Sequence, residues 1–111
     1  MNDIVKKCLY DIKTSIELIY LHLKGDLKFD AYQNDITAKR AVEREFEIIG
    51  EAVNRILLED SSVQISDTRK IIALRNRIIH GYDTIDEAII WNVIVNNLPK
   101  LKIEVEALLS E

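Results

Sequence analysis

The sequence is short of the residues that cross-link chains and interrupt helices. Among its 111 residues there are one cysteine, one proline and three glycines. The single cysteine, Cys8, excludes an internal disulfide and is typical of a reducing, cytoplasmic setting. Because turn-forming residues are so few, the chain is expected to form long helices with few connections.

The absence of several other sequence features excludes whole classes of function. No apolar run reaches the length of a membrane span, and the first ten residues carry charges where a signal peptide would be apolar. The two histidines and Cys8 lie far apart in the sequence, so no metal site is expected. No glycine-rich phosphate loop, Walker motif or nucleophile elbow is present, and no cofactor is expected.

Apolar residues repeat with helical spacing along most of the chain. Hydrophobic residues make up 48% of the sequence, enough for one core and for one domain over residues 1–111. Stripes with steps of three and four predict helices over residues 3–23, 35–59, 68–79 and 83–108, and residues 26–34 hold the anchors of a short helix. Pro99 is expected to kink or restart the last helix. The predicted fold is all-α, an antiparallel bundle of four to five helices.

Two features predict close packing. Gly50 lies in the middle of the second long helix, where it costs roughly 1 kcal/mol relative to Ala, and it is interpreted as a close approach of two backbones. Several apolar residues lie off the main stripe of the last helix. These off-stripe residues are Ile85, Ile89, Trp91 and Val93. A second copy of the chain is expected to cover part of this surface, so that the chain forms a homodimer.

The charge of the chain is unevenly distributed. Fifteen Lys and Arg stand against 19 Asp and Glu, giving a net charge of -4, which counts against general nucleic-acid binding. Residues 69–80 nevertheless contain four cations and no acid: Arg69, Lys70, Arg75 and Arg77. An RNA-binding surface is therefore expected to be local, with Arg69, Lys70 and Arg77 around Arg75.

The same stretch, LRNRIIHGY over residues 74–82, contains the residue types needed to cleave RNA. Histidine moves protons near neutral pH, and arginine holds phosphate oxygens through two donors. In a metal-independent cleavage the RNA 2'-hydroxyl attacks its own phosphate. His80 would move a proton at the attacking or leaving oxygen, and Arg75 would stabilise the charge on the phosphorane.

The spacing sets a geometric condition. On an ideal helix positions 75 and 80 point about 140° apart, so Arg75 and His80 converge only if the helix loosens near Gly81 or if Arg75 reaches round it. Taken alone, an Arg and a His five residues apart more often serve a surface ion pair or a helix cap. Tyr82 alone is more typical of a half-buried aromatic residue than of a modification site.

A row of charges follows the second long helix. Arg44, Glu47, Glu51 and Arg55 share one face, and this favours an intrahelical row of ion pairs. The functional alternative is that Glu51 orients Arg75 or His80.

Three blocks of the sequence together resemble a known family. They are AVEREFEIIGEAVNRI (residues 41–56), ALRNRIIHGYDTID (residues 73–86) and IIWNVIVNNLPKLK (residues 89–102). In order and spacing they are similar to the HepT-like toxins of the HEPN superfamily. The sequence departs from the usual pattern at Lys39 and Arg40, where an acidic residue is common.

This resemblance implies a fold, an activity and partners. The fold is a helical bundle that dimerises, with the Arg and His motifs of both protomers lining a shared cleft. The activity is that of a metal-independent RNase toxin acting on tRNA or mRNA, in a type VII-like toxin–antitoxin pair. By position, Arg75 and His80 are the catalytic residues, with Asn76 and Glu51 in support. The partner is a minimal nucleotidyltransferase antitoxin of the MntA type, which would silence the toxin by transferring AMP to Tyr82.

A second function stays open from the sequence. The chain could be a non-catalytic helical subunit that binds a nucleotidyltransferase and presents substrate to it. The acidic net charge is in keeping with this alternative. The alternative predicts a tight complex with the nucleotidyltransferase and no RNA cleavage. 

Overall fold

All the regular secondary structure of the described residues is helical. The computed structural model describes residues 1–81 and 85–111, and in these ranges the chain forms six helices and no strand. The helices are α1 (Asp3–Leu23), α2 (Phe29–Gln33), α3 (Ile36–Glu59), α4 (Thr68–His80), α5 (Glu87–Asn96) and α6 (Leu98–Leu109). The all-α prediction is confirmed, with one helix more than expected because the last predicted helix is divided into α5 and α6.

Local residues explain where the long helices begin and where the last one divides. The Asn2 side chain accepts a hydrogen bond from the Val5 N–H at 2.7 Å, and Asp35 accepts one from Ala38 at 3.0 Å. These side chains satisfy N–H groups that have no partner inside the helix. Pro99 lies in the first turn of α6, where its missing N–H costs nothing. The expected restart at Pro99 is confirmed.

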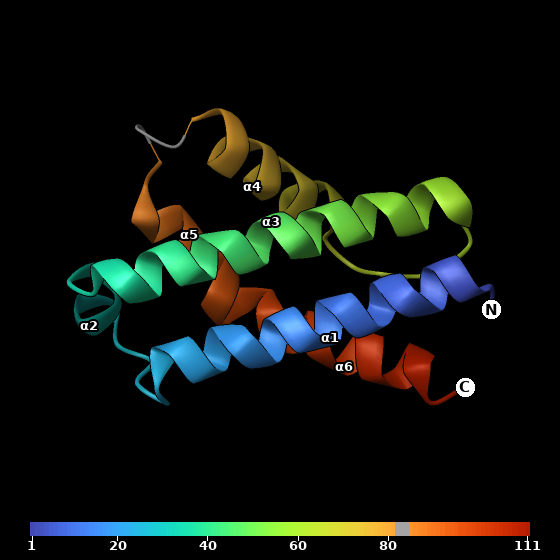
Figure 1. Cartoon of the computed structure of the whole chain (residues 1–111), viewed down its shortest axis with the longest axis horizontal. Helices are drawn as coiled ribbons and strands as arrows, with labels where there is room; N and C mark the ends of the chain where they lie inside the picture. Colours follow the sequence, from blue (N-terminus) through green and yellow to red (C-terminus); the bar gives the residue numbers. More distant parts are fainter. Residues whose placement is uncertain (82–84) are drawn as a thin grey trace.

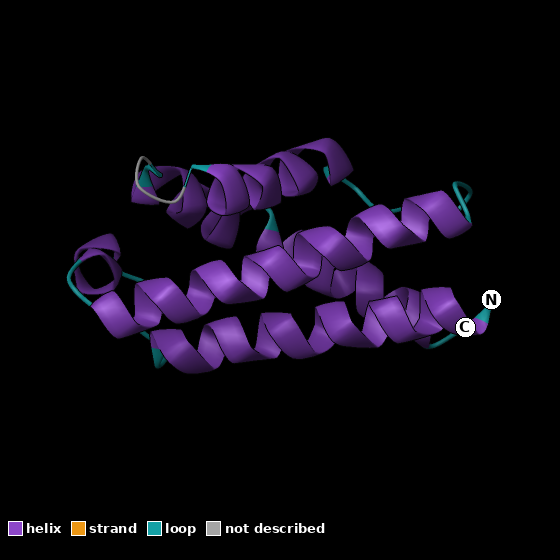
Figure 2. Ribbon diagram, turned by 45° about the horizontal axis from the view of Figure 1, so that its top comes forward, coloured by secondary structure: helices purple, strands orange, loops and turns teal. Residues whose placement is uncertain are grey.

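The two longest helices form the centre of the bundle. In Figure 1, α1 and α3 run side by side in opposite directions, with both chain termini at the same end. Helix α4 packs on α3, α6 packs on α1, and α5 contacts α6 and α2, an arrangement that Figure 2 shows from a second side. The apolar stripes meet between these helices, where Ile12, Phe46 and Ile49 are at most 1% exposed. Each such side chain contributes about 1.5–3 kcal/mol by leaving water.

Most of the off-stripe residues of α5 are covered by the chain itself. Val93 is 1% exposed and belongs to the core, while Ile85 and Ile89 pack against it partly buried. The Trp91 ring stacks on Tyr32 with ring centroids 5.3 Å apart. Val93 therefore does not face a second copy, which corrects the expectation for that residue, whereas Ile85, Ile89 and Trp91 are only partly buried, so a partner surface there stays a prediction.

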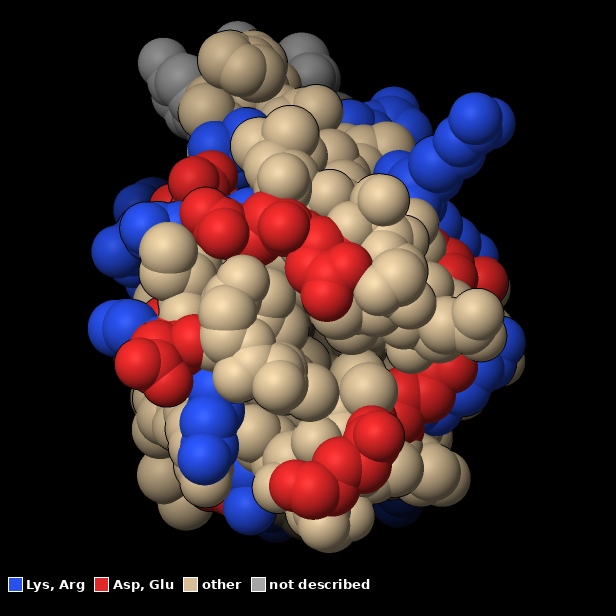
Figure 3. Space-filling view, turned by 90° about the vertical axis from the view of Figure 1, so that its right-hand side faces the viewer, with Lys and Arg blue, Asp and Glu red and all other residues tan. Residues whose placement is uncertain are grey.

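The end of the molecule that holds both termini carries mixed charges. In Figure 3 acidic side chains cross the middle of this end, and basic ones lie mostly toward its margins. Among the residues drawn in colour there, no continuous basic surface is formed. Separately, no helix within residues 1–81 and 85–111 combines the length and apolar content of a transmembrane segment.

Candidate functional site

The Arg75 side chain lies in a space that a glycine on the neighbouring helix leaves open. A Cβ atom placed on Gly50 of α3 would lie 2.3 Å from Cβ of Arg75 and 2.7 Å from its Cγ. Side chains do not pack at such distances, so the stem of Arg75 can lie against α3 only because residue 50 is glycine. A close approach is found at Gly50 as predicted, but the nearest atoms belong to the Arg75 side chain and not to a second backbone.

Two side chains hold the Arg75 guanidinium. Nη2 donates to Oε2 of Glu51 at 2.9 Å, and Nη1 donates to Oδ1 of Asn76 at 2.9 Å. The Nε atom is buried and has no hydrogen-bond partner within the described residues. Arg75 keeps 28% of its side chain exposed. Its orientation is therefore set by α3 and α4 together, with part of the guanidinium still open to a ligand.

The row of ion pairs predicted on α3 forms only in part. Arg44 pairs with Glu47 at 2.9 Å, as expected. Glu51 pairs with Arg75 of α4 instead of with Arg55 one turn further along α3. The close approach at Gly50 brings the Arg75 guanidinium within reach, and this tertiary contact supports the functional alternative for Glu51. Because Glu51 is 61% exposed, the pair contributes less than about 1 kcal/mol to stability, so it matters more for orientation than for stability.

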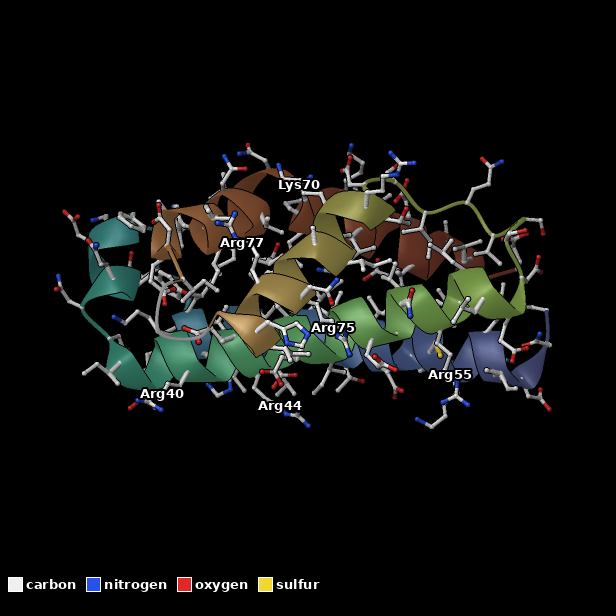
Figure 4. All side chains as sticks on the ribbon, turned by 90° about the horizontal axis from the view of Figure 1, so that it is seen from above. Arg40, Arg44, Arg55, Lys70, Arg75 and Arg77 are labelled. Atoms are coloured by element: carbon white, nitrogen blue, oxygen red, sulfur yellow. The ribbon has the colours of Figure 1, made fainter. Side chains whose placement is uncertain are left out.

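Arg75 and Glu51 lie in a groove of about 450 Å³ between α1, α3 and α4. Figure 4 shows Arg44 and Arg55 on α3, with Arg75 of α4 between them in the direction along α3. The volume falls within the range of small-molecule and cofactor sites. The groove is lined by Cys8 and Asp11 of α1, by Arg44, Glu47, Ile48, Glu51, Ala52 and Arg55 of α3, and by Arg75 and Ile79 of α4.

The helix does not loosen before His80. His80 is the last residue of α4, and the following Gly81 N–H donates to the Arg77 carbonyl at 2.8 Å, an ordinary α-helical bond. The expectation of a loosened end is therefore wrong. His80 is exposed at the end of α4 and is not among the groove-lining residues, and within the described residues no hydrogen bond joins it to Arg75. A single chain thus presents the arginine in a groove and the histidine at a helix end.

The other cations of α4 face elsewhere. In Figure 4 Lys70 and Arg77 lie on the side of α4 toward α5 and α6, away from Arg75. The Lys70 ammonium donates to Oδ1 of Asn92 on α5 at 3.2 Å, and Arg69 is exposed. The basic stretch of the sequence is therefore divided between two faces of α4. Tyr82, the expected modification site, lies outside the described residues.

Sequence reasoning missed an acidic cluster on the other side of α3. The Tyr32 hydroxyl of α2 donates to Oε2 of Glu87 at the start of α5, at 2.6 Å. Burial and a hydrogen bond with Glu87 raise the pKa of Glu43 on α3 to about 7. Burial, followed by the hydrogen bond to Glu87, also raises the pKa of Tyr32. Three helices, α2, α3 and α5, contribute residues to this cluster, and no spacing in the sequence signals this.

The α1 side of the groove was also missed. Cys8 and Asp11 both line it, and their spacing of one helical turn beside the apolar stripe of α1 is the signal that could have found them. Burial raises the pKa of the Cys8 thiol, which keeps the thiol protonated and unreactive. As for metals, residues 1–81 and 85–111 contain no group of three or more His, Cys, Asp or Glu placed to bind an ion.

Comparison with known proteins gives consistent matches over nearly the whole chain. A family model described as "Ribonuclease HepT-like" matches residues 12–108. The chain is 35% identical to "Putative RNase MJ1380" of Methanocaldococcus jannaschii, over 92% of this chain and 94% of that protein. It is 32% identical to "Putative RNase TTE0752" of Caldanaerobacter subterraneus subsp. tengcongensis, over 93% and 92%.

A third relative carries the family's own name. The chain is 31% identical to "Probable ribonuclease HepT" of Thermococcus cleftensis, over 93% of this chain and 94% of that protein. No solved structure gives a significant match. The family match covers α3 and α4 completely, including the glycine and the arginine that meet there. This chain therefore belongs to the HepT-like ribonuclease family of the HEPN superfamily.

Proposed function

We propose that the chain is a metal-independent endoribonuclease toxin in which Arg75 and His80 carry out the cleavage. The observation that supports this best is the position of the Arg75 side chain and the contacts that hold it. Its stem lies against Gly50 and its guanidinium is oriented by Glu51 and Asn76 at the edge of an open groove. An arginine fixed in this way is suited to bind a phosphate with both terminal nitrogens.

The proposed reaction is an internal transfer at phosphorus. The 2'-oxygen forms a bond to the phosphorus atom, and the bond from phosphorus to the 5'-oxygen breaks. The 2'-hydroxyl gives up one proton and the 5'-oxygen accepts one, so the products are a 2',3'-cyclic phosphate and a free 5'-hydroxyl. His80 moves one of these protons, and Arg75 stabilises the extra charge on the phosphorane oxygens.

Glu51 is proposed as a positioning residue. It holds the Arg75 guanidinium at 2.9 Å while remaining 61% exposed. A solvent-exposed ion pair is weak, so an RNA phosphate can compete with the carboxylate for one edge of the guanidinium. Glu51 would then keep Arg75 in place between turnovers without holding it back from substrate.

A homodimer would bring the two halves of the site together. His80 is exposed at the end of α4, and the adjacent Ile79 is 37% exposed although it is a large apolar residue. A second protomer packed over this end would cover Ile79 and place both Arg75–His80 motifs along one cleft. Light scattering on the purified chain tests this, and a monomer at working concentration would contradict it.

Silencing is proposed to occur through Tyr82, two residues beyond His80. A nucleotidyltransferase antitoxin of the MntA type would join the Tyr82 oxygen to the α-phosphorus of ATP. Pyrophosphate leaves and the phenol loses its proton. The added phosphate would compete with RNA for Arg75. If toxicity is blocked by co-expression of the cognate enzyme while intact-protein mass spectrometry shows no added AMP, this part of the proposal fails.

The cellular test uses induced expression of the chain in bacteria. The unmodified chain is expected to arrest growth and to degrade tRNA or mRNA, whereas Arg75→Ala and His80→Ala are expected to permit growth at equal protein level. Arg40→Ala is the matched control, because Arg40 is exposed and is not among the groove-lining residues. Growth arrest by both site variants would contradict the mechanism. A tight complex with a nucleotidyltransferase but no RNA cleavage would instead favour the non-catalytic subunit.

The predicted RNA contacts on α4 would serve a longer substrate. Lys70 and Arg77 lie on the face of α4 away from the groove, and Arg69 is exposed. In the proposal these residues contact RNA phosphates outside the cleaved segment, and their loss weakens binding with little effect on the chemical step.

A further inference from the structure

The groove beside Arg75 contains a second arginine whose charge is not paired. Arg55 lines the groove from α3 and is exposed. Within the described residues it makes no hydrogen bond or ion pair. The other charged side chains of the groove are all paired at 2.8 or 2.9 Å: Arg44 with Glu47, Arg75 with Glu51 and Asp11 with Lys7. In this part of the chain Arg55 is therefore the cation left available to a ligand.

The position of Arg55 relates it directly to Arg75. Arg55 follows Glu51, which holds Arg75, by one turn of α3, or about 6 Å along the helix axis. In the view of Figure 4, Arg75 of α4 lies at a point along the length of α3 between Arg44 and Arg55. The step of one turn separates the backbones of Glu51, at which the Arg75 guanidinium is held, and Arg55, and it is similar to the separation of neighbouring phosphates in an extended RNA strand. One strand could thus contact both Arg75 and Arg55 with successive phosphates.

The surface between the two arginines suits the rest of a nucleotide. Cys8 and Ala52 line the groove and are only 5% and 6% exposed, so this part of the floor is apolar and closely packed. The flat apolar face of a base can pack on such a floor at little desolvation cost, while the phosphates face the arginines. Contacts of this kind recognise the backbone and do not read the base.

We propose that Arg55 binds a backbone phosphate flanking the scissile one, so that single-stranded RNA lies along α3. This inference rests on the proposed RNase function and adds to it a site that positions the strand. Arg55 does not touch the reacting atoms. Its loss should weaken RNA binding and raise KM while leaving kcat within about twofold of the unmodified value.

The test compares Arg55→Gln and Arg55→Lys with the control Arg40→Gln, which removes the same charge from α3 outside the groove. Cleavage of a fluorescent single-stranded RNA gives kcat and KM, and fluorescence anisotropy in a His80→Ala background gives Kd between about 50 and 200 mM salt. Arg55→Gln is expected to raise KM and Kd roughly tenfold and to lower the salt slope by about 0.7. Arg55→Lys should retain most of the binding and the slope.

The outcomes separate this inference from the function on which it rests. If the unmodified chain cleaves RNA but Arg55→Gln matches Arg40→Gln in KM, Kd and salt slope, the phosphate site is wrong and the RNase function stands. A fall in kcat with KM unchanged would also overturn a binding role. If the unmodified chain neither binds nor cleaves RNA, the proposed function itself fails, and this inference fails with it.

Discussion

The contact between Gly50 and Arg75 makes a prediction that can be worked out from distances. In Gly50→Ala the new Cβ would lie 2.3 Å from Cβ of Arg75, more than 1 Å short of the 3.4 Å at which ordinary contact begins. The clashing atoms are the stem of Arg75 at Cβ and Cγ, which cannot rotate away as a side-chain tip could. Helix α4 must therefore move outward from α3 by about an ångström.

The effect of Gly50→Ala on the free energy of unfolding has two opposing parts. Overpacking of this kind costs about 1–3 kcal/mol, whereas replacing a mid-helix Gly by Ala returns about 1 kcal/mol of helix propensity. Gly50→Ala should therefore leave stability unchanged or lower it by up to about 2 kcal/mol. In an Arg75→Gly background the clashing atoms are absent, so the same substitution should raise stability by about 1 kcal/mol.

Urea denaturation of the four proteins measures this double-mutant cycle. A coupling energy of about 1–3 kcal/mol between the two positions is expected. In RNA cleavage assays Gly50→Ala should lose up to about 100-fold in kcat, because a displacement of 1 Å in a positioning group has that effect. Equal stabilisation by Gly50→Ala in both backgrounds, with full activity, would refute the packing argument.

Three further predictions concern single side chains. Glu51→Gln should lower kcat several-fold by releasing Arg75, yet change the free energy of unfolding by less than about 1 kcal/mol, since the pair is exposed; a loss of stability with normal cleavage would contradict the positioning role. Burial and the Glu87 hydrogen bond raise the pKa of Glu43 from 4.5 to about 7. Between these two pH values the Glu43 carboxyl is protonated in the folded chain but ionised in the unfolded chain, so the free energy of unfolding should fall as the pH rises through this range. Glu43→Gln should flatten this part of the profile in urea titrations at several pH values, and an unchanged profile would count against the raised pKa of Glu43. Lys24 has a left-handed backbone with φ of 56° at the end of α1, so Lys24→Gly should raise stability by up to about 1 kcal/mol in thermal melts; a lower Tm would oppose this.

The beginnings of α1 and α3 were predictable because their causes are local. Asn2 and Asp35 accept hydrogen bonds from N–H groups three residues later, and both signals can be read within one turn of sequence. Pro99 likewise divides the last helix by a property of its own ring. The predicted beginning of the last helix at residues 83–84 lies outside the described residues, and α5 itself begins at Glu87, capped by Asp86.

The site was predictable only in part because its key contact is tertiary. The sequence singled out Gly50 as a close approach, but it could not show that the neighbour would be Arg75, 25 positions away. By local spacing Arg55 was the expected partner of Glu51, and the packing of α4 on α3 gave Arg75 that place instead. The expected loosening at Gly81 failed because its N–H closes an α-helical bond to Arg77.

The central claim is that Arg75 and His80 together cleave RNA without a metal ion. The most direct measurement is cleavage of a single-stranded RNA by the purified chain in excess EDTA, with mass spectrometry of the product ends. The unmodified chain should produce 2',3'-cyclic phosphate ends, and Arg75→Ala and His80→Ala should each lose at least about 100-fold in rate while keeping their helical circular dichroism. Cleavage that needs added metal, or that persists undiminished in both variants, would contradict the account.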